Sequence, residues 1–306
     1  MQRYLIKRLL SLLGTLFGVS VLVFLIVHLI PGDPAEHILG EHPTQEAIKA
    51  LRTELGLDKP LLVQYVNYAG KLLQGNLGTS FMTHETVWSQ IVNRFPLTLQ
   101  LAAFSIVIAV VAGVILGVIS AVKHNTIIDR LMVICSLVGI SAPGFWVALL
   151  LIWIFAYKLA LVPISGYEGI SSLILPAITI ALSTMGSIAR VTRSSMLDVI
   201  KQDYMRTAEA KGAAYYAVVF RHGLKNALIP VITLVGLEFG SLLAGAVVAE
   251  TVFSLHGIGS MAIEAIGKRD IATIQGMTFF LAVLFVLTNL VVDIIYSFVD
   301  PRIKYE

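Results

Sequence analysis

The feature that most constrains this chain is a series of long apolar runs, free of charged residues except for one glutamate in the fifth, separated by polar segments. They span residues 9–30, 97–122, 131–157, 169–189, 226–249 and 271–292. A helix of about 20 apolar residues crosses a hydrocarbon core of about 30 Å. Charged residues make up 13% of the chain, against about 25% in soluble domains. The sequence therefore predicts an all-α polytopic membrane protein with six transmembrane helices.

The polar segments divide the chain into three parts. Residues 1–30 contain the N-terminus and the first span, 31–96 form a water-exposed insertion, and 97–306 carry the other five spans. Within the insertion, we expect one helix to start at Thr44 and stop at Gly56, and a second to follow Pro60 and end near Gly75. Segments of this kind can lie on a membrane surface.

The distribution of basic residues predicts how the spans are oriented. With the N-terminus inside, fourteen of the 22 Lys and Arg residues are cytoplasmic and eight are outside. Five of those eight lie in the 31–96 insertion, and long translocated segments count weakly in this rule. Both termini and the loop 190–225 are therefore expected in the cytoplasm, and the insertion outside.

Motifs for covalent chemistry are missing. The sequence has no P-loop, no His-Glu-x-x-His, no Cys-x-x-Cys and no Gly-x-Ser-x-Gly. No two of the seven histidines are four residues apart, which leaves only a metal site assembled across helices. We expect no catalytic residue, no metal and no cofactor in this chain. Two functional classes of membrane protein can be compared with the sequence: a secondary transporter, which usually has internal repeats, and an intramembrane enzyme. The sequence shows neither a repeat nor a nucleophile with its base.

The third run is interrupted by Ser141-Ala142-Pro143-Gly144. A proline inside a helix kinks or breaks it, and broken backbone at membrane depth must face protein or a water-filled cavity. Pro143 is therefore a candidate for lining a pathway. A plain kink is the equally weighted alternative.

Polar residues within the spans are the other pathway candidates. Glu238 lies in the middle of the fifth run and Asp293 just after the sixth, one helical turn from Asn289. A bare charge there costs several kcal/mol, so each should face the bundle interior, pair or be protonated. For Glu238, a pathway through the membrane and an interface with a second membrane subunit are equally weighted, whereas for Asp293 a tie between helices is favoured over a transport role. Glu250 is expected near the outer mouth, as a cap or an outer gate.

Small residues in the fifth run indicate close helix packing. They are Gly236, Gly240, Ala244 and Gly245. We expect this span to lie near the central pathway.

The segment from Asp203 to Pro230 is the most informative part of the polar regions. Read as a helix, it places Tyr204, Ala208 and Gly212 on one face with a small-residue centre. An amphipathic cytoplasmic helix of this kind suits docking to a soluble partner. An ordinary basic loop that holds the topology is the equally weighted alternative.

Residues 204–212, Tyr-Met-Arg-Thr-Ala-Glu-Ala-Lys-Gly, resemble the cytoplasmic signature loop of ABC importer permeases in the branch that transports dipeptides, oligopeptides and nickel. The general form of that loop has Glu-Ala-Ala ahead of the glycine, where this chain has Arg206, Thr207 and Ala208, as is usual in the peptide branch. Further resemblances follow in order along nearly the whole chain: Pro31-Gly32-Asp33-Pro34, Leu55-Gly56-Leu57-Asp58-Lys59-Pro60, Gly75-Asn76-Leu77-Gly78, Glu250-Thr251-Val252-Phe253, Arg269-Asp270 and Asp300-Pro301-Arg302. The early Pro-Gly-Asp-Pro and the long insertion resemble the first of the family's two permeases.

The resemblance implies a type I ABC importer permease fold and a coupling helix that sits in a groove of an ATPase subunit. The implied coupling residues are Tyr204, Arg206, Thr207, Ala208, Ala210, Lys211 and Gly212. It also implies a second permease, two ATP-binding subunits that hold ATP and Mg²⁺, and an external solute-binding protein in a bacterial plasma membrane. Peptides are the first substrate expected, with nickel, a metal chelate or glutathione as alternatives.

Overall fold

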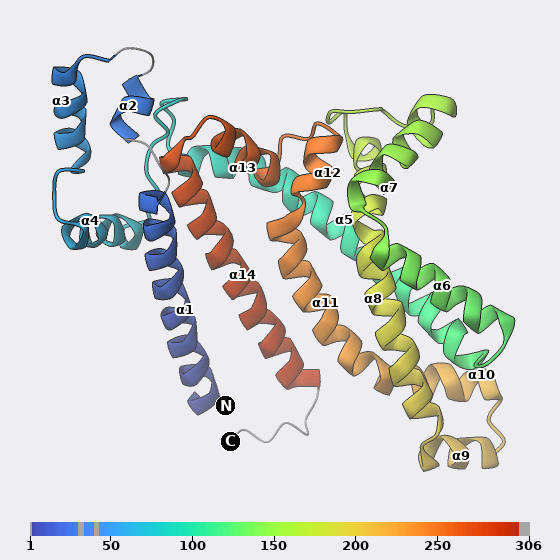
Figure 1. The fold of residues 1–306 in the computed structure, drawn as a ribbon. Coiled ribbons are helices and arrows are strands. Elements are labelled where there is room, and N and C mark those ends of the chain that lie inside the picture. The colour runs from blue at the N-terminus through green and yellow to red at the C-terminus, as the bar shows by residue number, and fades with distance from the viewer. Residues whose placement is uncertain (1, 30–33, 40–42, 300–306) are drawn as a thin grey trace. The chain divides into compact units, whose positions relative to one another are not determined.

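The computed structural model describes residues 2–29, 34–39 and 43–299, and within these ranges the regular structure is helical apart from one isolated antiparallel bridge between Thr79 and Thr86 (Figure 1). The chain forms two compact units. The first contains the described residues up to Pro96 together with Gly257–Val286, and the second contains Leu97–His256 and the described residues from Leu287 onward. The domain boundaries expected from the sequence stay predictions. The Pro31-Gly32-Asp33 turn and Asp300-Pro301-Arg302 lie outside the described residues.

The helices of the first unit begin with α1 (Gln2–Leu29), α2 (Pro34–Leu39), α3 (Gln45–Leu55) and α4 (Leu61–Leu73). The unit continues into the first turns of α5 (Val87–Val122), α13 (Ile258–Gly267) and most of α14 (Ile271–Val299). Its core packs Val87 and Ile91 of α5 against Met261 of α13 and Met277 of α14.

The predicted helix signals of the insertion are confirmed. Thr44 caps α3 by accepting a hydrogen bond from the Ala47 amide at 3.3 Å, and Gly56 ends the helix in the left-handed conformation with φ of 70°. α4 follows Pro60 as expected, and Gly75, two residues beyond the helix, has φ of 75°.

The second unit contains the rest of α5, α6 (Ile127–Ser141), α7 (Gly144–Leu151), the π-helix η1 (Ile152–Lys158) and the short η2 (Ile170–Leu173). It continues with α8 (Ile174–Ile200), α9 (Asp203–Ala210), α10 (Tyr215–Val218) and the π-helix η3 (Val219–Leu224). α11 (Lys225–Gly245), α12 (Val247–Val252) and the last turns of α14 complete it.

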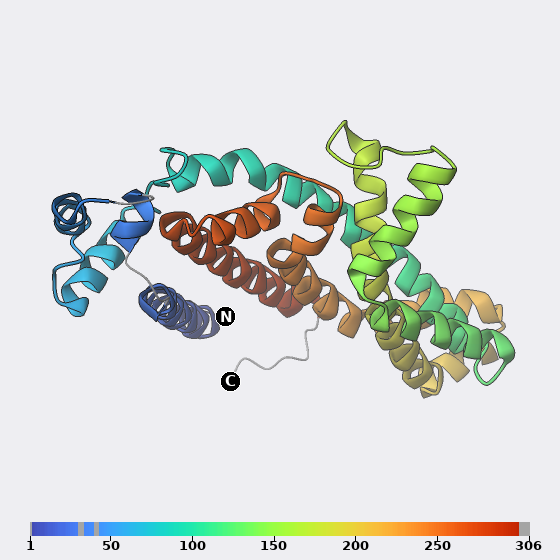
Figure 2. The same ribbon diagram turned by 45° about the horizontal axis from the view of Figure 1, so that its top comes forward.

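All six predicted apolar runs fold as helices. Among the described residues, four helical stretches are long and apolar enough to cross a membrane: Val87–Val122, Ile170–Ile200, Tyr215–Leu243 and Ile271–Ile294. The third run forms a bent pair, α6 and α7–η1, which bends by 104° at the break between the two helices. Figure 2 shows this bent pair. The first run lies in α1, where the described apolar stretch Leu10–Ile26 is shorter than these candidates, so that four of the six predicted spans, or five with the bent pair, meet the length and composition of a span among the described residues. The all-α membrane fold is therefore confirmed.

Close helix contacts in the second unit centre on α8. A Cβ on Gly117 of α5 would lie 2.5 Å from the Thr192 Cβ, and one on Gly113 would lie 2.9 Å from the Ile188 Cβ. On its other side, α8 presents Gly186, where a Cβ would lie 2.4 Å from the Ser136 carbonyl oxygen of α6. These glycines let the backbones approach closely, which is how membrane helices gain packing contact. α8 is thereby held between α5 and α6.

Candidate functional site

The predicted cytoplasmic loop 190–225 is mostly helical. Its first residues continue α8 as far as Ile200, and from Tyr215 onward the chain is already in the helical run that leads into α11. Only α9 and the turn after it stand apart from these two long helices. The candidate coupling residues therefore sit on a short helix between the ends of α8 and α10.

α9 is fixed to the unit through Met205, which is 3% exposed. A Cβ on Gly223 of η3 would lie 3.1 Å from the Met205 Cε and 3.6 Å from the Met196 Cε of α8. Tyr204 adds a polar contact, because its hydroxyl accepts a hydrogen bond from the Asn226 Nδ2 at 3.1 Å. These contacts set the rotation of α9 about its own axis.

The predicted face of Tyr204, Ala208 and Gly212 is wrong in its last member. α9 ends at Ala210, and Gly212 lies in the following turn. Within α9, Met205 is buried and Ala208 is half-buried, whereas Tyr204, Arg206, Thr207 and Ala210 are exposed. The packing of Met205 against neighbouring helices decides which side chains of α9 are exposed. The four-residue spacing in the sequence does not show this packing.

Gly212 ends the helix through its backbone. Its φ is +84°, and its amide donates to the Glu209 carbonyl oxygen at 2.9 Å. Left-handed φ is readily adopted by glycine and strained for most other residues. No atom lies within 4 Å of the position a Cβ would take, so the surface beside Gly212 and the exposed Lys211 is open.

An ion pair near the same end of α8 was missed by the sequence reasoning. Asp129, in the first turn of α6, accepts two hydrogen bonds from Arg193 of α8, Nε to Oδ1 at 2.8 Å and Nη2 to Oδ2 at 2.9 Å. Ser120 of α5 donates to the same carboxylate, and the Asn125 amide donates to it at 3.0 Å. The Asp129 side chain is 5% exposed. The pair therefore ties α5, α6 and α8 together.

A local signal for part of this site was present in the sequence. Thr126 caps α6 by accepting from the Asp129 amide at 3.4 Å, which is the N-terminal capping pattern of a threonine three residues before an acidic residue. The pattern predicts a helix start there. It does not identify Arg193 as the partner of Asp129.

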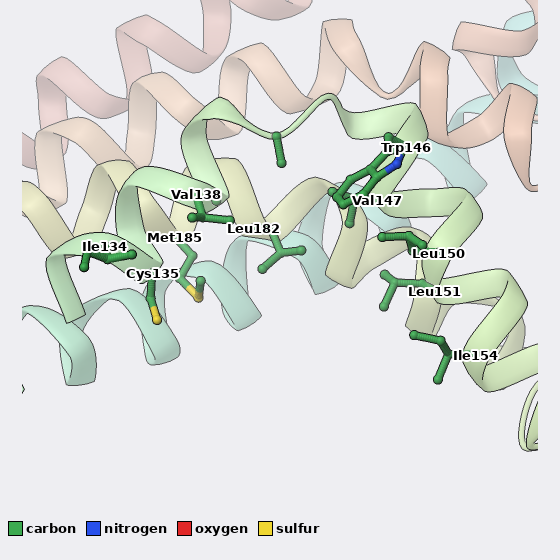
Figure 3. Close-up of a pocket in the computed structure, with 12 residues that line it drawn as sticks. Ile134, Cys135, Val138, Trp146, Val147, Leu150, Leu151, Ile154, Leu182 and Met185 are labelled. Atoms are coloured by element: carbon green, nitrogen blue, oxygen red, sulfur yellow. The ribbon is translucent and has the colours of Figure 1, made fainter. Parts of the chain in front are cut away.

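Pro143 lies at the elbow between α6 and α7, where it is exposed. The elbow encloses an apolar groove of about 440 Å³ against α8. Figure 3 shows Cys135 and Val138 of α6, Trp146 and Leu150 of α7, and Met185 of α8 around it. The interruption expected at Pro143 is thus a break between two helices, and its role in a pathway stays a prediction.

Glu238 and Gly240 lie on α11, beside α8. Glu238 is half-buried, and the Thr184 hydroxyl of α8 donates to its Oε2 at 3.5 Å, a long hydrogen bond. Gly240 is buried. Close packing of the fifth span is seen at Gly236, where a Cβ would lie 2.2 Å from the Val292 Cγ2 of α14.

Glu250 is completely buried in α12. Its Oε1 accepts a hydrogen bond from the Thr98 hydroxyl of α5 at 2.6 Å. Around it lies an apolar cluster that includes Leu101, Phe253 and Leu255. A carboxylate held in this way ties α12 to α5, whereas the sequence suggested a cap or an outer gate.

Asp293 is half-buried on α14. The neighbouring Asn289 Oδ1 is buried without a hydrogen-bond partner in the part of the chain that the structure describes. Over the same residues, no group of three or more His, Cys, Asp or Glu side chains is placed to hold a metal ion. The contact expected between Asn289 and Asp293 stays a prediction.

Comparison with known proteins gives the family. Residues 113–305 match the model described as "Binding-protein-dependent transport system inner membrane component", and residues 1–102 match the corresponding N-terminal model. The chain belongs to this family of ABC importer permeases. The permease is 44% identical to the dipeptide transport system permease protein DppB of Alkalihalophilus pseudofirmus and 44% identical to the glutathione transport system permease protein GsiC of Escherichia coli O6:H1, with 100% of both chains covered in each case.

The fold agrees with a solved ABC transporter. The permease matches a chain of the inward-facing MetNI methionine ABC transporter with a TM-score of 0.59 at 18% identity, covering 70% of the permease and 97% of that chain. This likeness confirms the type I importer permease fold expected from the sequence.

Proposed function

We propose that this permease forms half of the translocation pathway of an ATP-driven importer for dipeptides and oligopeptides. The observation that carries the proposal is the full-length similarity to DppB at 44% identity. A further relative, the di/tripeptide transport system permease protein DppB of Pseudomonas aeruginosa, is 42% identical over the whole of both chains. Peptide import agrees with the motifs of residues 204–212.

α9 and the turn at Gly212 are the proposed contact with an ATPase subunit. Three properties support this role: α9 is short, its buried Met205 fixes it to both α8 and η3, and its opposite side is exposed. A displacement of α9 would therefore be transmitted to α8 and, through η3, to α11. In this proposal Tyr204 and Ala208 position the helix, while Arg206, Thr207, Ala210, Lys211 and Gly212 face the partner.

The proposed assembly contains a second permease, two ATP-binding subunits with ATP and Mg²⁺, and an external solute-binding protein. The permease itself carries no catalytic group in this scheme. Both of its termini and α9 are placed in the cytoplasm, on the basis of the Lys and Arg distribution. ATP binding would shift the population of inward- and outward-facing states through contacts made outside this chain.

Glu238 and Gly240 are the proposed pathway residues, together with Pro143 at the elbow. Glu238 is supported by its half-buried position beside α8 and by the cost of leaving a carboxylate in lipid. Glu250 and Asp293 are proposed as ties between helices. Complete burial and the Thr98 hydrogen bond support this assignment for Glu250.

The test is ATP hydrolysis by the whole importer in lipid, with and without the binding protein loaded with a dipeptide. Ala210→Glu places a charge on the exposed side of α9 without straining the backbone. Ala50→Glu makes the same change at an exposed position of α3 and serves as the matched control. We expect loaded binding protein to raise hydrolysis in the native importer and in Ala50→Glu, but much less in Ala210→Glu. Equal stimulation in both variants would refute the coupling role.

Glutathione is the second candidate substrate, because GsiC is as similar to this permease as DppB is. The same assay separates the two substrates when the binding protein is loaded with glutathione instead of a dipeptide. Stimulation by glutathione alone would replace the peptide proposal and leave the importer assignment unchanged.

A further inference from the structure

α4 is a helix with three different faces. Gln64, Tyr65 and Tyr68 lie on one face, Leu62, Val66, Ala69 and Leu73 on the second, and Asn67 and Lys71 on the third. The 3.6-residue period of the helix produces this separation. Each face has a different environment in the first unit.

The first face packs on α1, and α4 lies beside the C-terminal part of that helix (Figures 1 and 2). Tyr65 donates to or accepts from the Ser20 hydroxyl at 2.9 Å, and its ring meets that of Phe24 edge-on with centroids 5.4 Å apart. The Gln64 Oε1 lies 3.0 Å from the His28 Nε2. Burial raises the pKa of Tyr68 to about 12. The contacts fix both the position and the rotation of α4 on α1.

These contacts also set the depth of α4. The uncharged run in α1 begins at Leu9 and continues to Leu29, the last described residue of this helix. The residues of α1 that contact α4 run from Ser20 to His28, about 13.5 to 1.5 Å before Leu29 along the helix axis, with Phe24 in the middle at about 7.5 Å. Interfacial helices bury their apolar face about 5–10 Å into the boundary between headgroups and acyl chains. α1 therefore holds α4 at the depth of such a helix.

The second face is apolar and uncovered. Leu62 is 75% exposed, Val66 60% and Leu73 91%, and they follow one another at helical spacing. On the third face Asn67 and Lys71 are exposed. A helix with one apolar and one polar exposed face, held beside a membrane-spanning helix, meets lipid on the first and water on the second.

We infer that α4 lies in the membrane surface at the C-terminal end of α1, with Leu62, Val66 and Leu73 inserted among the lipid acyl chains. The occupant of this face is lipid because α1 places it at the level of the bilayer boundary. This inference concerns the insertion between the first two spans, and it does not depend on the transported substrate or on the coupling role of α9.

Site-specific labelling tests the inference in the intact importer. The single Cys135 is first replaced, Cys135→Ala. Single cysteines are then introduced as Leu62→Cys, Val66→Cys and Leu73→Cys, with Asn67→Cys and Lys71→Cys as controls on the same helix. Each is labelled with an environment-sensitive fluorophore in nanodiscs, with or without spin-labelled acyl chains. We expect the three apolar positions to show blue-shifted emission and quenching by the spin label, and the two polar positions to show neither.

Two results would overturn the inference. Equal emission and quenching at all five positions would mean that α4 does not lie with its second face in lipid. Blue-shifted emission at Leu62, Val66 and Leu73 without quenching by the spin-labelled lipid would mean that a protein surface covers this face. The polar positions report in the same samples whether the opposite side of α4 stays in water.

Discussion

Breaking the ion pair between Asp129 and Arg193 should destabilise the permease. The loss of stability should depend on which of the two residues is replaced. Arg193→Leu removes the arginine from an almost completely buried carboxylate, since the Asp129 side chain is 5% exposed, and leaves the His124 Nδ1 at 3.3 Å from its Oδ2. Asp129→Asn leaves an arginine whose side chain is 27% exposed and so keeps part of its hydration. The loss should therefore be larger for Arg193→Leu than for Asp129→Asn.

The magnitudes follow from this asymmetry. Removing one partner of a buried ion pair costs about 3–5 kcal/mol, which we expect for Arg193→Leu. Losing hydrogen bonds to a charged group costs about 1.5–3 kcal/mol, which we expect for Asp129→Asn. The double variant should lose less than the sum of the two, with a coupling energy of about 1–3 kcal/mol.

The assay is thermal unfolding of the purified permease in detergent at one scan rate, because irreversible unfolding makes the midpoint depend on that rate. At about 2–4 °C per kcal/mol, Arg193→Leu should lower the midpoint by on the order of 10 °C. Arg190→Leu, at an exposed position of the same helix, is the matched control and should change little. If Arg193→Leu behaved like Arg190→Leu, or if the two single effects added without coupling, the tie between α6 and α8 would be refuted.

Three other substitutions test the packing, the turn and the buried carboxylate. Gly117→Ala should lower stability by about 1–3 kcal/mol through overpacking, because the new Cβ would lie 2.5 Å from Thr192. Gly18→Ala is the control: no atom lies within 4 Å of its new Cβ, so the melting temperature should stay unchanged or rise slightly. Equal melting temperatures for the two variants would contradict the close contact at Gly117. Gly212→Val should lower stability by about 1–2 kcal/mol through left-handed backbone strain and should reduce stimulated ATP hydrolysis. Gly212→Asn should keep most of the stability and of the stimulated hydrolysis, because asparagine tolerates this conformation. Equal losses in the two variants would show that backbone conformation is not the cause. Thr98→Val removes the hydrogen bond to Glu250 and should lower stability by about 1.5 kcal/mol, the lower end for a hydrogen bond to a charged group. Thr15→Val is the control and should cost much less, because the exposed Thr15 hydroxyl donates to the Ser11 carbonyl oxygen of its own helix. The reverse order in the same melting assay would refute the role of Thr98.

The sequence by itself determined the membrane fold, because each signal it used is local. A run of about 20 apolar residues has to be helical in lipid, where backbone groups can pair only within the segment. Thr44 and Gly56 marked the ends of α3 for the same reason, since a cap acts within one turn of its helix. The spacing of residues 204–212 and their resemblance to a permease family likewise predicted a short helix where α9 is found.

Only the tertiary structure decided which residues meet across the fold. Asp129 and Arg193 are 64 positions apart, and nothing in either segment names the other. The rotation of α9 depends on Met205 packing against Gly223 of a later helix, and in this packing Ala208 is half-buried while Tyr204 stays exposed. The position of α4 on α1 is likewise set by contacts such as that between Tyr65 and Ser20. Such contacts depend on how separate helices pack, and a periodic pattern within one helix shows which face is apolar without showing what covers it.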